Sequence, residues 1–223
     1  MGSMIEFARP DAKRAPGYLA EPPDRPAAPG VVMLEEWWGV NDQMKHTAER
    51  LASEGFRVLV PDLYRGRVAA TGDEANHLMQ GLDFGDAANQ DARGAAQFLK
   101  QRSSKVGVTG YCMGGALALL AAMYVPEFDA AVVYYGCPPP EAGDPSKIRI
   151  PLMGHWALHD EFFNIATVDA LEERLKAGNV PYEFYRYDAG HAFCNPKGLG
   201  NYKHEEAETA WRRSVDFFHR TLE

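Results

Sequence analysis

Residues 106–120 of the chain read VGVTGYCMGGALALL, and this stretch decides the fold. The β-branched residues of positions 106–109 predict a buried strand, and the run ALALLAAMYV at 116–125 predicts a helix. The turn between them, Gly110-Tyr111-Cys112-Met113-Gly114, matches the strand–turn–helix pattern G-x-nucleophile-x-G, with cysteine in place of serine. The sequence therefore predicts that Cys112 occupies a sharp elbow between a strand and a helix.

An elbow of this kind gives a cysteine unusual chemistry. The reversal lifts the side chain above the strand ends and places it at a helix N-terminus, where free N–H groups favour an anion. Most free cysteines are buried and structural, and we interpret Cys137 and Cys194 in that way. For Cys112, the combination of strand, glycine spacing and helix favours a nucleophile.

A nucleophile in this architecture needs an acid and then a histidine later in the chain. Asp160, after the predicted strand 150–153, is the preferred acid; Glu161 is an alternative, as is a merely solvated loop carboxylate. His191, just beyond the predicted strand 182–187, is the preferred base. Of the other histidines, two lie before or beside the acid and four in helix-like stretches: His155, His159, His46, His77, His204 and His219.

Strand-like and helix-like segments alternate from about residue 31, which predicts an α/β fold with a mostly parallel twisted sheet and helices on both faces. The expected strands span 31–34, 56–60, 106–109, 130–135, 150–153 and 182–187. The expected helices lie near 42–54, 86–102, 114–125, 165–178 and 202–220. We expect Asp86 to cap the second helix, Gly178 to end the fourth, and an apolar stripe to dock the last: Ala207, Trp211, Ser214, Val215 and Phe218.

The length of 223 residues predicts a single domain over 4–223, with 21–30 as a loop and Met1-Gly2-Ser3 as a remnant of expression. The net charge of −8 and the lack of clustered Lys and Arg argue against nucleic-acid binding. No apolar run approaches the roughly 20 residues that cross a bilayer, and no secretory signal pattern opens the chain, so we expect a cytoplasmic protein without a membrane partner. Three cysteines without CxxC spacing predict free thiols, no disulfide framework and no metal site.

Six motifs together resemble the dienelactone hydrolase family of α/β-hydrolases: GYCMGG around Cys112, Asp160 in HDEFF, His191 in AGHAF, and the segments EWWGVN at 36–41, PDLY at 61–64 and YYG at 134–136. The resemblance implies Cys112 as nucleophile, His191 as base and Asp160 as its orienting acid. It also implies that Glu36 hydrogen-bonds the resting thiol and takes part in forming the thiolate. The elbow geometry adds the backbone N–H groups of Trp37 and Met113 as an oxyanion hole.

The resemblance predicts a hydrolase that needs no cofactor and opens lactones of the carboxymethylenebutenolidase type, or cleaves small esters, through a thioester acyl-enzyme. Two alternatives remain: a broad-scope carboxylesterase, and a non-catalytic or redox-sensing relative in which Cys112 responds to oxidant. The partner expected is a small lactone or ester, with the protein a monomer or weak oligomer.

The chain departs from the family at two arginines that are expected to hold a substrate carboxylate. Position 195, four after His191, is Asn195, and residues 69–82 contain no arginine. The nearby cations Arg65, Arg67 and Lys197 do not reproduce a planar two-point clamp. Instead, aromatic residues predict an apolar pocket. The expected substrate-binding residues are Trp38, Tyr64, Tyr135, Trp156, Phe162 and Asn195; Trp37, Phe84 and Phe163 are further candidates for the pocket wall.

Overall fold

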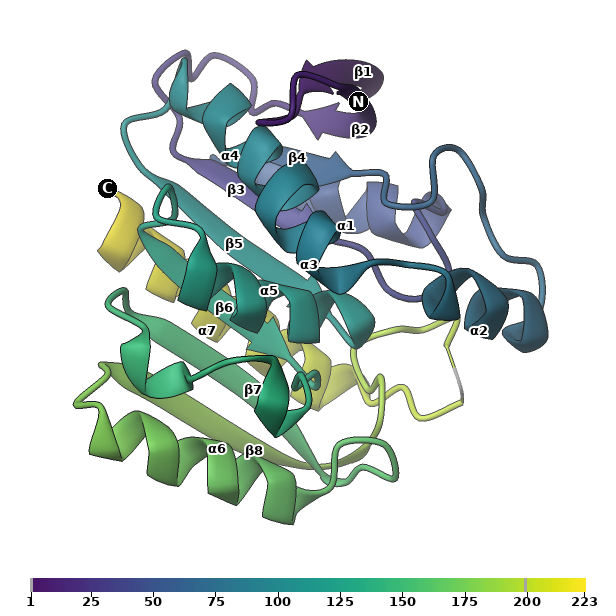
Figure 1. The fold of residues 1–223 in the computed structure, drawn as a ribbon, viewed down its shortest axis with the longest axis vertical. Helices are drawn as coiled ribbons and strands as arrows, with labels where there is room; N and C mark the ends of the chain where they lie inside the picture. Colours follow the sequence, from purple (N-terminus) through teal and green to yellow (C-terminus); the bar gives the residue numbers. More distant parts are fainter. Residues whose placement is uncertain (1, 199) are drawn as a thin grey trace.

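The computed structural model describes residues 2–198 and 200–223, and its centre is an eight-stranded sheet (Figure 1). The strand order is β1-β2-β4-β3-β5-β6-β7-β8; β3 to β8 are mutually parallel, while β2 is antiparallel to β1 and β4. The strands are β1 (Ser3–Ala8), β2 (Arg14–Ala20), β3 (Gly30–Leu34), β4 (Arg57–Pro61), β5 (Val106–Tyr111), β6 (Ala130–Tyr134), β7 (Leu152–His159) and β8 (Tyr182–Gly190). The predicted mostly parallel α/β fold is confirmed.

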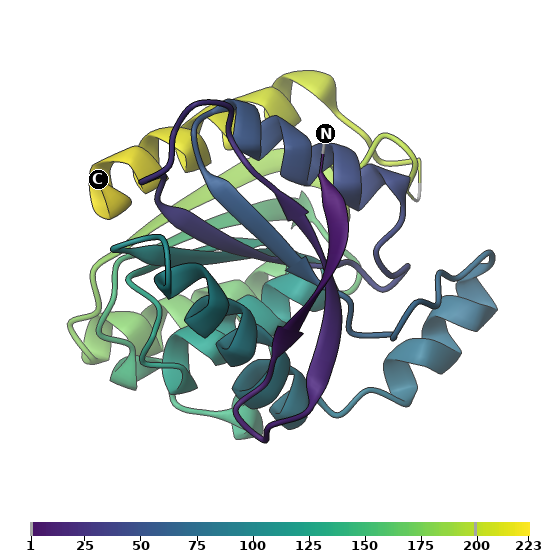
Figure 2. The same cartoon turned by 90° about the horizontal axis from the view of Figure 1, so that it is seen from above.

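Helices cover both faces of the sheet (Figure 2). One face carries α1 (Asp42–Ser53) and α7 (His204–Leu222), and the other carries α4 (Arg93–Lys100), α5 (Met113–Tyr124) and α6 (Ile165–Ala177). The helix α2 (Gly72–Gln80) protrudes from one side of the molecule, as Figure 2 shows. The short helices are α3 (Phe84–Asp86), the π-helix η1 (Ala87–Ala92), and the 3₁₀ turns η2 (Pro140–Ala142) and η3 (Pro145–Lys147).

The apolar core lies in two layers, one on each side of the sheet. The central strands β3, β5 and β6 are buried at every residue, which is why their sequences are continuous apolar runs rather than alternating ones. Most of α5 is also buried, since its alanines and leucines face the sheet on one side and neighbouring helices on the other. The predicted stripe on α7 is confirmed, because all five of its residues are buried.

The six predicted strands and five predicted helices are all present, and Gly178 caps α6 as expected. Most ends shift by a few residues, but the strand expected at 150–153 is β7, which runs from Leu152 to His159. The prediction for 86–102 was wrong in detail. That helical segment begins earlier, at Phe84; Asp83 is its N-cap, whose side chain accepts the backbone N–H of residue 86, and the segment contains a π-helical turn. Asp86 is not the cap, because its carboxylate instead pairs with Arg9 at 2.8 Å.

Three elements escaped the sequence analysis: β1, β2 and α2. The strands β1 and β2 form an edge hairpin whose β1 is largely exposed, so its sequence SMIEFA lacks a strong apolar pattern. Ser3, which the sequence interpretation set aside with the leading residues, begins β1. The helix α2 has the polar sequence GDEANHLMQ and buries only Ala75 and Leu78, so its apolar periodicity is too short to detect.

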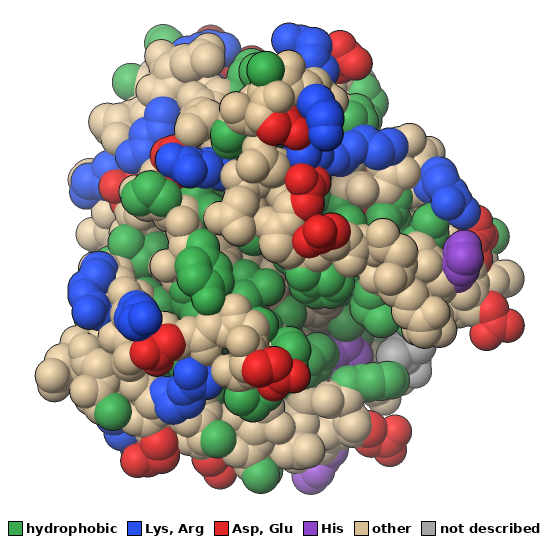
Figure 3. Space-filling model, viewed as in Figure 1, with side chains coloured by type: hydrophobic (Ala, Val, Ile, Leu, Met, Phe, Trp, Pro, Cys, Tyr) green, Lys and Arg blue, Asp and Glu red, His purple; other side chains and the backbone are tan. Residues whose placement is uncertain are grey.

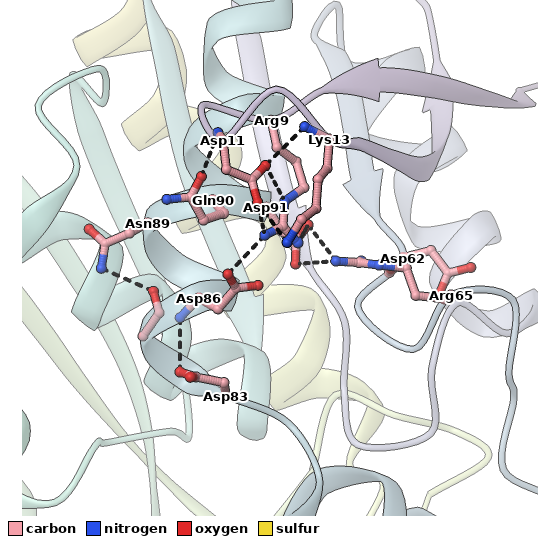
Figure 4. A network of polar contacts seen from close by, with 11 residues as sticks. Arg9, Asp11, Lys13, Asp62, Arg65, Asp83, Asp86, Asn89, Gln90 and Asp91 are labelled. Atoms are coloured by element: carbon pink, nitrogen blue, oxygen red, sulfur yellow. Dashed lines mark hydrogen bonds and ion pairs between the residues drawn. The ribbon is translucent and has the colours of Figure 1, made fainter.

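A buried ion network joins the β1–β2 turn, the loop after β4 and the π-helix (Figure 4). Asp91 is almost fully buried and accepts bonds from Arg9 at 3.2 Å and from Arg65 at 2.9 Å to both carboxylate oxygens. Asp62 accepts the backbone N–H groups of Tyr64 and Gly66, which fixes the turn that carries Arg65. The network therefore anchors the loop after β4 to the π-helix η1.

Within the described ranges, the structure contains no helix with the length and apolar character that crossing a membrane would require.

Candidate active site

The backbone at Cys112 has the strained geometry of a nucleophile elbow. Its φ of 55° and ψ of −116° lie in a region that residues with a Cβ avoid, and Cys112 stands between the end of β5 and the first residue of α5. The reversal needs glycine at Gly110, where a Cβ would collide with the backbone oxygen of Gly114. It also needs glycine at Gly114, because a Cβ there would collide with the backbone oxygen of Leu34 in β3. The predicted elbow is present.

Three side chains from different strand ends meet at this elbow. The Nε2 atom of His191 lies 3.0 Å from the Sγ atom of Cys112, and its Nδ1 atom lies 2.8 Å from Oδ2 of Asp160. Cys112 follows β5, Asp160 follows β7 and His191 follows β8, so the carboxyl ends of parallel strands bring them together. The structure thus places the three residues that the sequence singled out in one hydrogen-bonded chain.

The Asp160 carboxylate is held on its other oxygen by the backbone. Its Oδ1 accepts the N–H groups of Phe162 and Phe163, both at 2.8 Å, and the side chain is buried. The same two phenylalanines pack their rings against the His191 imidazole, with centroid distances of 4.9 and 5.6 Å. Glu161, the alternative acid, is exposed to solvent. The carboxylate that orients the imidazole is therefore Asp160.

The environment of Cys112 keeps its sulfur protonated at rest. Burial raises the pKa of the Cys112 thiol well above its usual range, and the nearby Glu36 carboxylate raises it further. The backbone N–H of Met113, at the start of α5, acts in the opposite direction because it stabilises the thiolate. Burial is the larger effect, so forming the thiolate requires a proton acceptor close by.

Glu36, directly beyond β3, is buried in the same place. Burial raises the pKa of its carboxyl to about 7, while a hydrogen bond from Nδ2 of Asn195 to Oε2, 2.5 Å long, lowers it. Asn195 is itself fixed, because its Oδ1 accepts the backbone N–H of Lys197 at 2.9 Å. A carboxyl with a pKa of about 7 changes its charge within the physiological pH range, so Glu36 is able to accept or release a proton at these pH values.

Cys112, His191 and Glu36 open into a cavity of about 450 Å³. Its wall is mostly apolar and aromatic, and no lysine or arginine is present among the described residues that line it. The space-filling view shows hydrophobic side chains gathered around a hollow on this face of the molecule (Figure 3). The remaining lining residues are Trp37, Trp38, Asn76, Met79, Phe84, Met113, Ala116, Cys137, Pro138, Pro139, Phe162, Phe163, Ala192, Asn195 and Gly198.

Of the six residues expected to bind substrate, Trp38, Phe162 and Asn195 line the cavity. The other three lie elsewhere. The Tyr64 hydroxyl is buried against Sδ of Met113 at 3.2 Å. Tyr135 is fully buried behind the site, with its ring 5.3 Å from that of His191, and Trp156 belongs to the core, packed edge-on against Phe184. Trp156 lies within β7, which extends beyond the predicted strand 150–153, so the sequence interpretation had placed this residue in a loop.

The structure adds wall residues that the sequence analysis missed. Asn76 and Met79 come from α2, which was not predicted, while Cys137, Pro138 and Pro139 follow β6. A proline run after a buried strand signals a rigid loop at the sheet edge where ligands bind in α/β folds. That signal was available in the sequence, whereas α2 gave none.

Two other buried polar groups near the strand ends stand outside the triad. Glu35 is fully buried, and neither carboxylate oxygen has a hydrogen-bond partner among the described residues. Burial raises the pKa of Glu35 well above its usual range, which favours the neutral form of the carboxyl. His155 bonds the hydroxyls of Tyr187 and Ser214, both at 2.8 Å, and burial lowers its pKa to about 3. His155 is therefore a neutral core residue.

The cations that flank the family motifs do not reach the cavity. Arg65 is engaged with Asp91, Arg67 lines a separate hollow beside α2, and Lys197 is exposed to solvent. Asn195, at the position where the family resemblance predicts an arginine, instead bonds Glu36. The described lining residues therefore offer no planar cation for a substrate carboxylate.

Comparisons with known proteins show which family the chain belongs to. The chain is 34% identical to "Protein usf" of Aquifex pyrophilus over 98% of each chain, and 31% identical to a carboxymethylenebutenolidase of Rhodococcus opacus over 94% of this chain and 90% of that one. A dienelactone hydrolase-like promiscuous phosphotriesterase from metagenomic libraries has the same fold, with a TM-score of 0.87, 24% identity, and coverage of 100% of this chain and 99% of that one. Residues 15–222 match the family model described as "Dienelactone hydrolase family". The chain, with its elbow after β5 and its hydrogen-bonded Cys112, His191 and Asp160, belongs to the dienelactone hydrolase family.

Proposed function

We propose that this family member is a cysteine-dependent hydrolase that opens uncharged lactones or cleaves small esters through a thioester on Cys112. One observation carries the proposal: Sγ of Cys112 lies 3.0 Å from an imidazole that Asp160 orients, at the floor of an apolar cavity. A buried thiol held this way serves nucleophilic catalysis, because the base that must take its proton already contacts it.

In the acylation step, the thiol gives its proton to Nε2 of His191, either directly or by way of the Glu36 carboxylate, and the thiolate attacks the substrate carbonyl carbon. The backbone N–H groups of Met113 and Trp37 stabilise the oxyanion that forms, an interaction typically worth roughly 3 kcal/mol for each donor. The C–O bond to the alcohol then breaks, the leaving oxygen takes a proton from His191, and the acyl group remains on sulfur.

In the deacylation step, His191 removes a proton from water, and the resulting hydroxide attacks the thioester carbonyl. The C–S bond breaks, the thiolate leaves, and the proton on His191 returns to sulfur. Asp160 keeps the imidazole in the tautomer that carries its proton on Nδ1, so Nε2 is free to act as the base in both steps. The cycle thus returns Cys112 and His191 to their starting protonation states.

The cavity wall favours substrates without a negative charge. A substrate carboxylate needs a cation nearby to offset the free-energy cost of its desolvation, and the described lining supplies neither lysine nor arginine. An additional anion would also lie near Glu36, whose carboxyl is half ionised near pH 7. Neutral lactones and aryl or alkyl esters meet neither penalty, so we place the substrate among them.

The test is to trap the acyl-enzyme. Wild-type protein is mixed with an aryl ester and quenched within the first turnovers, and intact-mass and peptide mass spectrometry locate the added acyl group. We expect it on Cys112, with release of the aryl alcohol in a burst. Cys112→Ala should remove both the adduct and the turnover, whereas Cys194→Ala, which removes another free thiol, should retain them. His191→Asn should slow acylation by roughly 10²–10⁴-fold.

Hydrolysis that persists in Cys112→Ala would exclude cysteine catalysis. Complete inertness of the wild type toward esters and lactones, combined with stoichiometric oxidation of Cys112 by peroxide, would instead favour a redox-sensing role.

A further inference from the structure

A second cavity, of about 350 Å³, adjoins the active-site cavity. It lies between α5, α6 and the segment 137–145, on the face of the sheet where both helices pack (Figure 1). The two cavities share three wall residues, Cys137, Pro138 and Pro139. The other residues that line the second cavity are Leu119, Met123, Pro140, Gly143, Pro145, Ala166, Thr167, Ala170, Leu171 and Arg174.

The helix α5 provides a common floor for both cavities. Ala116 lines the active-site cavity, and Leu119 and Met123 line the second one. These three residues are spaced three and then four apart, so they lie along one face of the helix. Cys112 immediately precedes that helix, and Met123 lies about 16 Å from it along the axis at 1.5 Å per residue. The two cavities therefore follow one another along α5, away from Cys112.

The wall of the second cavity offers apolar contact and little else. Apart from Thr167, the polar side chain in its lining is Arg174, and the protein itself occupies that guanidinium. It donates to the backbone oxygens of Pro140 at 3.3 Å and Gly143 at 2.9 Å, and it pairs with Asp144 at 3.6 Å. A ligand in this cavity meets methyl, methylene, thioether and proline carbons, which suits a linear aliphatic chain.

We propose that the second cavity binds the aliphatic acyl chain of the substrate, so that the preferred esters are those of medium-chain fatty acids. This inference rests on the proposed function. The acyl side is assigned because the acyl group stays bonded to Sγ of Cys112 after the alcohol leaves, and α5, along which the two cavities lie, begins directly after that residue. The alcohol leaves from the carbonyl beside His191, whose proton it takes.

The experiment compares p-nitrophenyl acetate, butyrate, hexanoate and octanoate, each below its critical micelle concentration. We expect kcat/KM of the wild type to rise by about fourfold for each methylene that enters the second cavity. Ala170→Trp places an indole in this cavity from an exposed position on α6, and it should abolish the rise beyond butyrate. Ala177 is exposed on the same helix outside the lining described above, so Ala177→Trp is the matched control and should keep the wild-type profile.

The outcomes separate this inference from the proposed function. A wild type that hydrolyses none of these esters contradicts the proposed function itself. A wild type that hydrolyses the acetate with equal or greater kcat/KM than the octanoate overturns the acyl-chain site alone. The acyl-chain site is also overturned if Ala170→Trp and Ala177→Trp have identical chain-length profiles. It is overturned as well if kcat/KM rises with the length of the alcohol in alkyl acetates up to octyl acetate but does not rise with the length of the acyl chain in the p-nitrophenyl esters.

Discussion

Replacing Glu36 with glutamine is predicted to change how the stability of the protein depends on pH. Burial raises the pKa of Glu36 to about 7, from the value of 4.5 that an exposed glutamate has. The folded state therefore holds this proton more tightly than the unfolded chain does. Stability from this group is fully present below the unfolded pKa and is lost as the pH rises through the folded pKa.

The size of the effect follows from the shift. A difference of about 2.5 pKa units, at 1.36 kcal/mol per unit, corresponds to about 3 kcal/mol of lost stability once the pH is well above 7. Between about pH 5.5 and about pH 8.5 the wild type should lose about 2 kcal/mol of this total, because part of it has already gone by the lower pH. Glu36→Gln keeps the shape of the side chain but cannot ionise, so it should not show this loss.

The assay is urea unfolding followed by tryptophan fluorescence at a series of pH values, with the free energy of unfolding of Glu36→Gln minus that of wild type plotted against pH. The difference should rise with pH in a single sigmoid centred between the two pKa values. Glu161→Gln, a substitution of an exposed carboxylate in the Asp160 loop, is the control and should give a flat difference. A flat line for Glu36→Gln as well would refute the account of Glu36 as a buried carboxyl with a raised pKa.

Two further substitutions test the contacts around the site. Asp160→Asn should leave the fold intact and lower kcat by on the order of 10³–10⁴-fold in steady-state assays, because an amide cannot hold His191 in the tautomer that exposes Nε2 as a base; a loss of less than tenfold would contradict this role. Burial raises the pKa of Asp91, and Arg65 opposes this shift, so Arg65→Met should destabilise the protein by about 1–3 kcal/mol in urea unfolding, and by more at higher pH where Asp91 must be ionised. Arg14→Met, which removes an exposed pair with Glu6, is the control and should cost at most about 1 kcal/mol.

The sequence was sufficient for the parts of the molecule whose signals are local. A buried parallel strand is a short apolar run, so β3 to β8 were all located, although β7 extends six residues beyond its predicted end. The elbow is specified by glycines that the backbone geometry requires, and the acid and base follow in an order that the topology dictates. For these reasons Cys112, Asp160 and His191 could be named before their mutual distances were known.

Other features depend on contacts that a single sequence does not display. Whether Trp156 faces the core or the cavity depends on its register in β7, and one position along a strand reverses the side. Asp86 was predicted as a cap because aspartate is typical of caps. Its carboxylate instead accepts a hydrogen bond from Arg9, which is distant in the sequence. The helix α2 is held by two buried side chains and supplies part of the cavity wall, so missing it also meant missing Asn76 and Met79.

The charges in the cavity link its electrostatics to the class of substrate. Ionised Glu36 raises the pKa of the Cys112 thiol, so a cavity that holds both groups as anions is unfavourable, and low dielectric makes this repulsion stronger than it would be in water. Loading a carboxylate-bearing substrate would add another negative charge, and the described wall has no lysine or arginine to offset it. A neutral ester adds no negative charge. By filling the apolar space it also excludes water, which strengthens the electrostatic interaction between Glu36 and Cys112. In the proposed mechanism, transfer of the thiol proton to the Glu36 carboxylate would then leave a single negative charge, on sulfur, at the N-terminus of α5, where the backbone N–H of Met113 stabilises it.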